Sequence, residues 1–329
     1  MRTMKGIVVK APGGVDQLEL VDLPMPSPGP SEVLIQVKAA GVNRPDILQR
    51  LGLYPPPAGA NPHLGLEVAG QVVETGEGVD PAFNGQAVMA LCNGGGYAQY
   101  VCVPAAQCMS IPQGLSFTQA ASLPEVYMTV WQNLVIKGGL KTGDTVLVHG
   151  GSSGIGTAAI QLCKRLGARV MVTVGQDSKV DVCTRLGADA VVNYRAQNWV
   201  DAALRFSDGR GVDLVLDMVA GPYLDKDLDC LAVEGKILVI ALLGGRTAEL
   251  DASKLLMKRA VLTGTTLRPQ SAGFKAALAA AVSRELSAGF EQGHYHTVVH
   301  SEFDLADVAQ AHRLMESGDL VGKVVLRIA

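Results

Sequence analysis

The sequence has few charges and no long apolar run. Only 18% of its 329 residues are charged, against roughly 25% in ordinary soluble proteins. Its apolar stretches are broken by Gly, Pro or a charge before they reach the ~18 residues that a membrane-spanning helix requires. The first residues also lack the apolar core and the small-residue cleavage site of a signal peptide. We therefore expect a soluble, cytoplasmic protein with no membrane partner.

A charge excess and a cysteine pattern are missing as well. The net charge is −3 and no basic face or arm is visible, so we expect no nucleic-acid partner. The six cysteines are scattered and no two have the spacing Cys-x-x-Cys, which predicts reduced, mostly buried thiols. Apolar residues, in contrast, make up 48% of the chain. The length predicts two domains, because single cores stop growing at roughly 250–300 residues.

The chain up to about Pro124 has the pattern of a β-rich domain. Short apolar runs alternate with clusters of Pro and Gly, which is typical of a small barrel or sandwich. Strands are predicted over residues 6–10, 32–40, 68–75, 86–91 and 98–103.

From Glu125 onward the pattern changes to alternating strands and helices, which indicates an α/β domain with a doubly wound parallel sheet. Strands are predicted over residues 145–149, 169–174, 190–193, 212–217, 236–241 and 261–265. Helices are predicted over residues 129–136, 156–166, 179–186, 198–207 and near 223–231. The last segment contains helices 272–287 and 305–317 and strands 297–301 and 323–328. Composition leaves open whether this segment extends the sheet or returns to the first domain.

The most informative motif lies between an apolar strand and a helix. It reads His149-Gly150-Gly151-Ser152-Ser153-Gly154-Ile155-Gly156. Glycines let the backbone turn tightly and approach a pyrophosphate, and the start of the helix offers unpaired N–H groups. This setting predicts a dinucleotide-binding turn, whereas a glycine-rich loop alone would also fit a purely structural turn.

The same glycine-rich motif occurs in short-chain dehydrogenases, whose chemistry depends on a Tyr-x-x-x-Lys pair. In that class the motif stands near the N-terminus, whereas about 140 residues precede it here. No tyrosine of this chain has a lysine four positions on, and Lys226 follows Tyr223 one position too early. Both observations count against that class.

The loop after the second α/β strand favours NADPH over NADH. Sites that prefer NAD usually carry an acid about 20 residues past the glycines, on the ribose hydroxyls. Here the strand ends in Val174-Gly175 without an acid, which leaves room for a 2′-phosphate that Lys179 can neutralise. Asp177 in the same loop either takes the ribose role or faces solvent.

The order of domains and two motifs resemble the medium-chain dehydrogenase/reductase superfamily over essentially the whole chain. In its alcohol dehydrogenases, Gly-x-Cys-x-x-Asp and Gly-His-Glu-x-x-Gly segments supply catalytic zinc ligands. The matching stretches here are 41–46 and 65–70, which place Asn43 and Leu66 at the ligand positions. The third ligand position matches Glu125, and the four-cysteine lobe for structural zinc is absent. Catalytic zinc needs three protein ligands and an open position, so we expect no metal and no ordinary alcohol dehydrogenation.

Within the superfamily the chain resembles the zinc-free quinone oxidoreductases related to zeta-crystallin. The segments that carry this resemblance are 43–46, 52–57, 193–195 and 322–326, and segments 123–125 and 244–245 resemble the tumour-suppressor-inducible NADPH quinone oxidoreductases. The resemblance implies a Rossmann domain over residues 125–268 that binds NADPH. It implies a GroES-like catalytic domain formed by residues 1–124 and 269–329, with hydride transfer in the cleft between the two.

The resemblance also implies a set of cofactor-binding residues. Lys179 and Tyr194 would contact the 2′-phosphate, beside Gly175 and Ser178. The pyrophosphate would lie on Gly151, Ser152, Ser153, Gly154, Ile155 and Gly156. The nicotinamide end would be lined by Thr129, Leu242, Leu243, Gly244, Thr266 and Leu267, with Lys323 returning from the C-terminal segment toward the cofactor.

A quinone accepts a hydride readily, so the expected chemistry is mostly positioning and stabilisation of the developing oxyanion. Asn43 is the candidate donor to that oxygen, although its side chain could equally cap the local turn. Tyr54 is the candidate for stacking or proton delivery, with Tyr127 as a second candidate.

Three functions stay open on this basis. They are NADPH-dependent quinone reduction, NADPH-dependent reduction of enone or enal double bonds, and nucleotide binding with little turnover. A homodimer or homotetramer is expected by family, because pairing of the apolar strand 261–265 across a two-fold axis would cover a sheet edge.

Overall fold

A computed structural model describes residues 2–329, and the chain divides into two compact units. The β-rich unit contains the chain up to Met128 together with Arg268–Ala329, and the α/β unit is Thr129–Leu267. Each unit has its own sheet and its own core.

The α/β unit contains a six-stranded parallel sheet with the strand order β10-β9-β8-β11-β12-β13. Continuous apolar runs such as Thr145–His149 form its central strands, because both faces of such a strand are buried. The strands are β8 (Thr145–His149), β9 (Arg169–Val174), β10 (Ala190–Asn193), β11 (Val212–Asp217), β12 (Leu231–Val239) and β13 (Val261–Gly264).

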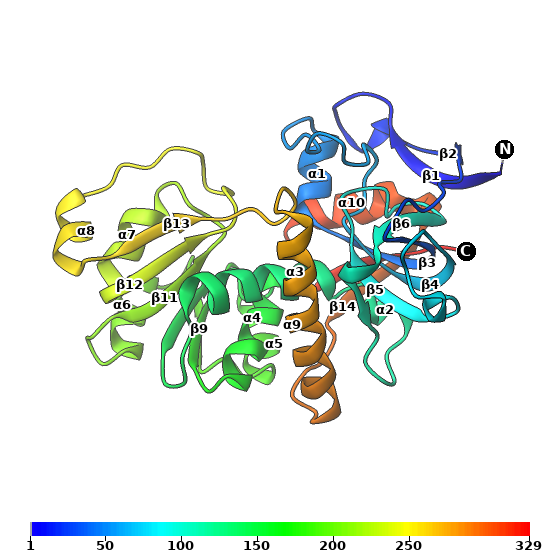
Figure 1. The fold of residues 1–329 in the computed structure, drawn as a ribbon. Helices are drawn as coiled ribbons and strands as arrows, with labels where there is room; N and C mark the ends of the chain where they lie inside the picture. The colour runs from blue at the N-terminus through cyan, green and yellow to red at the C-terminus, as the bar shows by residue number, and fades with distance from the viewer. Residues whose placement is uncertain (1) are drawn as a thin grey trace. The chain divides into compact units, whose positions relative to one another are not determined.

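Helices cover both faces of this sheet, with α4 and α5 on one side and α6 and α7 on the other (Figure 1). The helices are α4 (Gly154–Arg165), α5 (Val180–Arg185), α6 (Trp199–Phe206), α7 (Tyr223–Cys230) and α8 (Ala252–Lys258). The strand order reverses between β8 and β11, so the carboxyl end of β8 lies at the switch point where such folds bind nucleotides.

The β-rich unit is built on a seven-stranded sheet and a separate β1–β2 ribbon. The sheet runs β14-β15-β3-β4-β5-β7, with β6 pairing β3. The strands are β1 (Thr3–Val9), β2 (Leu18–Pro24), β3 (Glu32–Val42), β4 (Glu67–Thr75), β5 (Ala87–Leu91), β6 (Tyr100–Pro104), β7 (Cys108–Ser110), β14 (Val299–Asp304) and β15 (Lys323–Arg327). The C-terminal segment therefore returns to the first unit, which settles the alternative that composition left open.

The helices of this unit are α1 (Arg44–Arg50), α2 (Phe117–Ala120), α9 (Ala272–Glu291) and α10 (Val308–Ser317). The sequence pattern predicted α9 and α10 but not the short helices α1 and α2. Helix α3 (Pro124–Val130) begins in the β-rich unit, and helical turns continue over Trp131–Gly138 in the α/β unit. Arg50, only 1% exposed, donates to Glu316 (2.8 Å) and contacts His312 Nδ1 (3.2 Å), which links α1 to α10.

No helix within residues 2–329 has the length and apolar character that crossing a membrane requires.

Candidate active site

Three strand ends of the β-rich unit meet at one edge of its sheet. Val324 of β15 pairs with Val42 of β3, and Val68 of β4 pairs with Ala40 of β3. The residues next to these pairs are the ones whose side chains come together: Asn43 after β3, Glu67 at the start of β4, and Lys323 at the start of β15. We call Asn43, Glu67 and Lys323 the strand-end cluster.

The members of the strand-end cluster bond to one another. The Lys323 ammonium lies 2.7 Å from Glu67 Oε1 and donates to Asn43 Oδ1 (2.5 Å) and to the Val42 carbonyl (3.2 Å). The Asn43 amide nitrogen in turn donates to Glu67 Oε1 at 2.8 Å. All three side chains are at least nine-tenths buried, and a buried ion pair is tolerated only with such additional hydrogen bonds.

The Asn43 side chain bonds to Glu67 and Lys323. Asn43 is also the N-cap of α1, where it forms a capping box with Asp46, so both roles considered for this residue have support. Lys323 has three N–H donors, and three protein oxygens accept from them. Lys323 therefore holds Asn43 and Glu67 in place. That Lys323 also points toward the cofactor stays a prediction.

Gly41 makes room for the strand-end cluster. A Cβ atom at this position would lie 2.6 Å from the Glu67 carboxyl carbon and 2.6 Å from the Ala121 carbonyl oxygen. Any side chain here would displace Glu67, which explains the glycine that precedes Asn43 by two positions.

Two further acids surround the cluster. Asp46 is 1% exposed, and its carboxylate accepts from the backbone N–H groups of Asn43 and Gly65, both at 2.9 Å. Burial raises its pKa to about 6, although the two N–H groups oppose this shift. The backbone N–H of Glu125 donates to Glu67 Oε2 at 2.8 Å. Burial together with Glu67 raises the pKa of the Glu125 carboxyl to about 8.

The residues at the three zinc-ligand positions do not fit a catalytic zinc ion. The Asn43 amide is occupied by Glu67 and Lys323, and Leu66 is a buried apolar side chain that cannot ligate. Glu125 alone is a usable ligand, whereas catalytic zinc requires three.

Tyr54 lies on the loop that follows α1, and it is partly buried with its ring 6.0 Å from the Arg268 guanidinium carbon. Arg268 is 5% exposed and donates to Gln49 Oε1 (2.6 Å) and to the Asn93 carbonyl (2.7 Å). Burial and the neighbouring Glu125 raise the Tyr54 pKa, against the effect of Arg268. A neutral phenol, a guanidinium and a carboxyl group are thus neighbours in this unit.

Tyr127 is separated from this group. Its side chain is 4% exposed, its hydroxyl has no hydrogen-bond partner within residues 2–329, and its ring packs edge-on against Tyr295 at 5.3 Å. Burial raises its pKa far above the ordinary value, so the phenol is a poor acid. These contacts argue for packing rather than proton delivery.

In the α/β unit, the glycine-rich turn joins β8 to α4 as the motif predicts. Ser153 is the N-cap of α4 and accepts from the Gly156 N–H at 3.0 Å. A Cβ atom at Gly156 would collide with the carbonyl oxygens of Gly150 and Gly151, so the helix start must be glycine. The turn leaves Ser152, Gly154 and Ile155 beside the first N–H groups of α4, where an anion is favoured.

The residues expected at a 2′-phosphate lie after the neighbouring strands β9 and β10. The Tyr194 hydroxyl lies against Gly175, where a Cβ atom would approach it to 2.7 Å. Lys179 precedes α5 and is 8% exposed, and Ser178 stands next to it. Asp177 is exposed, and its carboxylate accepts from the Asn193 amide at 2.8 Å.

The remaining predicted residues lie at the ends of β12, β13 and α3. Leu242 and Leu243 are each 52% exposed in the loop after β12, and Gly244 donates to the Val219 carbonyl at 2.6 Å. The Thr129 and Thr266 carbonyls accept side-chain bonds from Asn133 (2.9 Å) and Gln132 (3.3 Å), and Leu267 is buried.

Sequence reasoning missed a buried network behind the glycine turn. His149 Nε2 lies 2.9 Å from Asp227 Oδ1, and its Nδ1 lies 3.1 Å from Thr173 Oγ1, which accepts from the Gly150 N–H at 3.3 Å. Asp217 completes a fully buried group. Burial raises the Asp227 pKa to about 6. Only the position of His149 before the glycines signals this network in the sequence.

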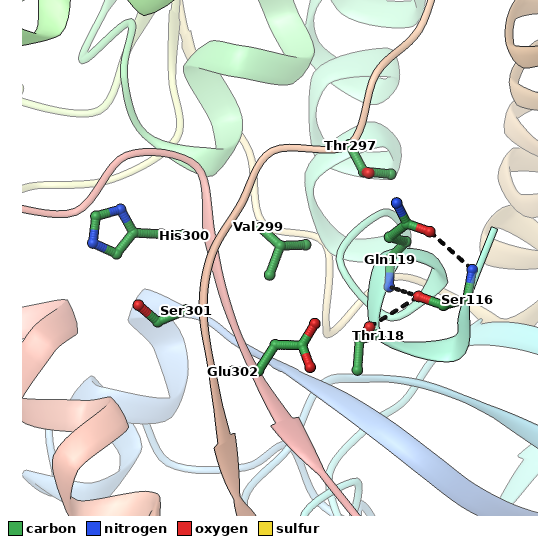
Figure 2. Close-up of a pocket in the computed structure, with 8 residues that line it drawn as sticks. All are labelled: Ser116, Thr118, Gln119, Thr297, Val299, His300, Ser301 and Glu302. Atoms are coloured by element: carbon green, nitrogen blue, oxygen red, sulfur yellow. Dashed lines mark hydrogen bonds between the residues drawn. The ribbon is translucent and has the colours of Figure 1, made fainter.

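A polar pocket of the β-rich unit lies apart from all these residues. Figure 2 shows it between the turn before α2 and strand β14, lined by Ser116, Thr118, Gln119, Thr297, Val299, His300, Ser301 and Glu302. Ser116 and Gln119 bond reciprocally in the α2 cap, and His300 Nδ1 accepts from the Val321 N–H at 3.4 Å. No predicted site residue lines it.

Two family models match the chain. One, described as alcohol dehydrogenase GroES-like domain, matches residues 29–113. The other, described as zinc-binding dehydrogenase, matches residues 154–283.

Curated relatives match along almost the whole chain. A human quinone oxidoreductase is 30% identical over 332 residues, which cover 99% of this chain and 98% of that protein. A phenolphthiocerol/phthiocerol polyketide synthase of Mycobacterium tuberculosis is 32% identical over 327 residues. That match covers 97% of this chain but spans only 14% of the much longer synthase polypeptide.

Solved structures are similar over the full length. A mycobacterial protein complexed with NADPH superposes with a TM-score of 0.88 and 31% identity, over 98% of this chain and 100% of that one. The CurK enoyl reductase has a TM-score of 0.88 and 25% identity, over 100% of both chains.

We expect Lys323→Met to lower the free energy of unfolding by about 3 kcal/mol, because it leaves the buried Glu67 carboxylate without its cation. The double variant Glu67→Gln/Lys323→Met removes both charges, so it should recover much of this loss. Urea denaturation measures the effect, with Lys10→Met as a control at an exposed lysine of the same unit. Equal stability of Lys323→Met and Lys10→Met would contradict the ion pair.

Proposed function

The chain belongs to the medium-chain dehydrogenase/reductase superfamily, with the zeta-crystallin-like quinone oxidoreductases as its type, and we propose that it reduces quinones with NADPH without a metal. The strand-end cluster is the observation that carries this proposal. At the first zinc-ligand position it holds the Asn43 amide, which the neighbouring buried ion pair of Glu67 and Lys323 positions as a hydrogen-bond donor. Leu66 stands at the second position, so no metal-ligand set is left. A quinone suits such a site, because it needs orientation and oxyanion stabilisation more than a Lewis acid.

Asn43 is the proposed donor to the substrate oxygen. Its amide has two N–H groups, and Glu67 accepts from the nitrogen while Lys323 fixes the amide oxygen. This leaves one N–H in a fixed direction, on a side chain 6% exposed. A preorganised donor of this kind stabilises charge that develops during the reaction. Tyr54, beside Arg268, is the proposed residue for stacking on the acceptor ring.

NADPH is the proposed cofactor, and it supplies the hydride when bound. The turn 151–156 at the start of α4 fits its pyrophosphate. A 2′-phosphate fits beside Gly175, Ser178, Lys179 and Tyr194. The one acid of the loop after β9, Asp177, accepts a hydrogen bond from the Asn193 amide. The solved NADPH complex of a similar protein supports this choice. Residues proposed toward the nicotinamide are Thr129, Leu242, Leu243, Gly244, Thr266 and Leu267.

A second candidate function is reduction of an enone or enal double bond with the same cofactor. The similarity to the CurK enoyl reductase over both full chains favours it. This reaction protonates an enolate carbon, so it demands more of an acid in the site than quinone reduction does. Nucleotide binding with little turnover is the third candidate.

We also propose that the chain forms a dimer through β13 and works in the cytoplasm. Strand β13 ends its sheet, and near this edge Leu256 is 76% exposed, Met257 74% and Val261 45%. An apolar, unpaired strand edge is a ready pairing surface. Light scattering of the purified chain distinguishes a dimer or tetramer from a monomer. The six free cysteines support a reducing compartment.

Assays of NADPH and NADH oxidation with 1,4-benzoquinone, 9,10-phenanthrenequinone and a simple enone test the proposed function. We expect quinone turnover with NADPH preferred. Turnover of the enone alone would transfer the assignment to double-bond reduction. Binding of NADPH without turnover of any acceptor would contradict both reductase functions and favour the nucleotide-binding protein.

The variant Lys179→Met tests the cofactor choice. Loss of a charge-assisted contact to a 2′-phosphate should raise the KM for NADPH by roughly 10–100-fold and leave the KM for NADH unchanged. Steady-state kinetics with both cofactors measure this, and Lys164→Met, at a lysine paired with Asp189 in the same unit, is the matched control. An equal change for both cofactors would argue that Lys179 is structural.

A further inference from the structure

Glu125 differs from the other acids around the strand-end cluster. Its main chain is anchored, because its N–H donates to Glu67 Oε2 at 2.8 Å. Its side chain is partly exposed at the start of α3, and its carboxyl has no hydrogen-bond partner within residues 2–329. A partly exposed residue whose backbone is fixed and whose carboxyl group has no protein partner is suited to contact a ligand.

The neighbouring acids are already occupied. Glu67 is fully buried and accepts from Lys323, from the Asn43 amide and from the Glu125 N–H. Asp46 is 1% exposed and accepts from two backbone N–H groups. Both side chains are buried and their oxygens already accept hydrogen bonds, so neither is open to a substrate. Of the acids around the cluster, Glu125 alone is positioned to give a proton to a substrate and regain one from solvent.

The charges that face Glu125 keep it protonated. Burial contributes most, and the carboxylates of Glu67 on β4 and Asp46 on α1 act in the same direction. Lys323 on β15 and Arg268 act in the opposite direction, and Tyr54 is a further titratable neighbour. The resulting pKa of about 8 leaves the carboxyl mostly neutral at pH 7.

We propose that Glu125 is the catalytic acid that protonates the reduced substrate. This inference rests on the proposed function. When a carbon of the substrate receives the hydride, an electron pair of its π system moves to the carbonyl oxygen. The Glu125 O–H bond then breaks, and its proton forms a new bond to that oxygen, or to the α carbon of an enolate. Glu125 is left as a carboxylate, and water returns the proton before the next turnover.

The variant Glu125→Gln tests this role, with Glu125→Asp to retain an acid and Glu77→Gln as a control at an exposed glutamate of the same unit. We expect Glu125→Gln to lower kcat for an enone by about 100-fold or more, as loss of a general acid does, without a change in NADPH binding measured by fluorescence. Glu125→Asp should recover part of the rate. A Glu125→Gln protein that turns over as fast as the wild type would overturn the proposal.

The pH profile gives a second criterion. Because the protonated form is required, the wild-type kcat/KM should fall tenfold per pH unit above about 8. Glu125→Gln should lack this descending limb, and persistence of the limb in the variant would overturn the role. If the wild type turns over no acceptor, the proposed function fails. If the wild type is active and Glu125→Gln matches it in rate and pH profile, only this inference fails.

A measurement without turnover tests the neutral carboxyl. The folded-state pKa lies above the ordinary value of 4.5, so the stability that the protonated group contributes is present at low pH and lost as the pH rises through about 8. The melting temperature of the wild type relative to Glu125→Gln should therefore fall between pH 5 and pH 8.5. A constant difference over this range would overturn the proposal.

Discussion

The ion pair between Glu67 and Lys323 holds together the part of the β-rich unit on which the proposed chemistry depends. It joins the starts of β4 and β15, and through Asn43 and the Glu125 N–H it fixes the end of β3 and the start of α3. Two charges buried this deeply are costly unless every remaining donor and acceptor is satisfied. Here the three donors of Lys323 and both oxygens of Glu67 have partners. Moving either charge away from its partners would therefore be costly, and this cost holds the side chains of the site in one arrangement.

In the proposed function, this constraint takes the place of a catalytic zinc ion. A zinc ion would polarise a carbonyl and fix its position in one step. In this chain the two tasks are divided between side chains. In the proposed mechanism Asn43 presents an amide N–H whose direction the ion pair sets, and Glu125 supplies the proton. Leu66 occupies the second ligand position with an apolar side chain. Electron-poor acceptors need no Lewis acid, which is why quinones and enones, and not alcohols, are the proposed substrates.

Much of the α/β unit could be predicted from the sequence, because its central strands are buried on both faces and appear as uninterrupted apolar runs. The bounds of β8 and β9 are those the pattern predicts. The β-rich unit was harder, since short elements such as α1 and β7 leave little periodicity. The site was only partly visible. Asn43 and Lys323 are 280 positions apart, and only the register of β15 on β3 brings them together. The sequence also could not show that Tyr127 and Glu125, two residues apart on α3, have different surroundings.

The central claim is that the strand-end cluster supports reduction without a metal, and metal analysis combined with kinetics tests it most directly. The purified protein would be dialysed against a strong chelator, its zinc content measured by mass spectrometry, and its NADPH-dependent quinone turnover recorded before and after addition of zinc. The account predicts far less than one zinc per chain and a rate that neither chelation nor added zinc changes. Stoichiometric zinc, with turnover that is lost on chelation and restored by the metal, would contradict it.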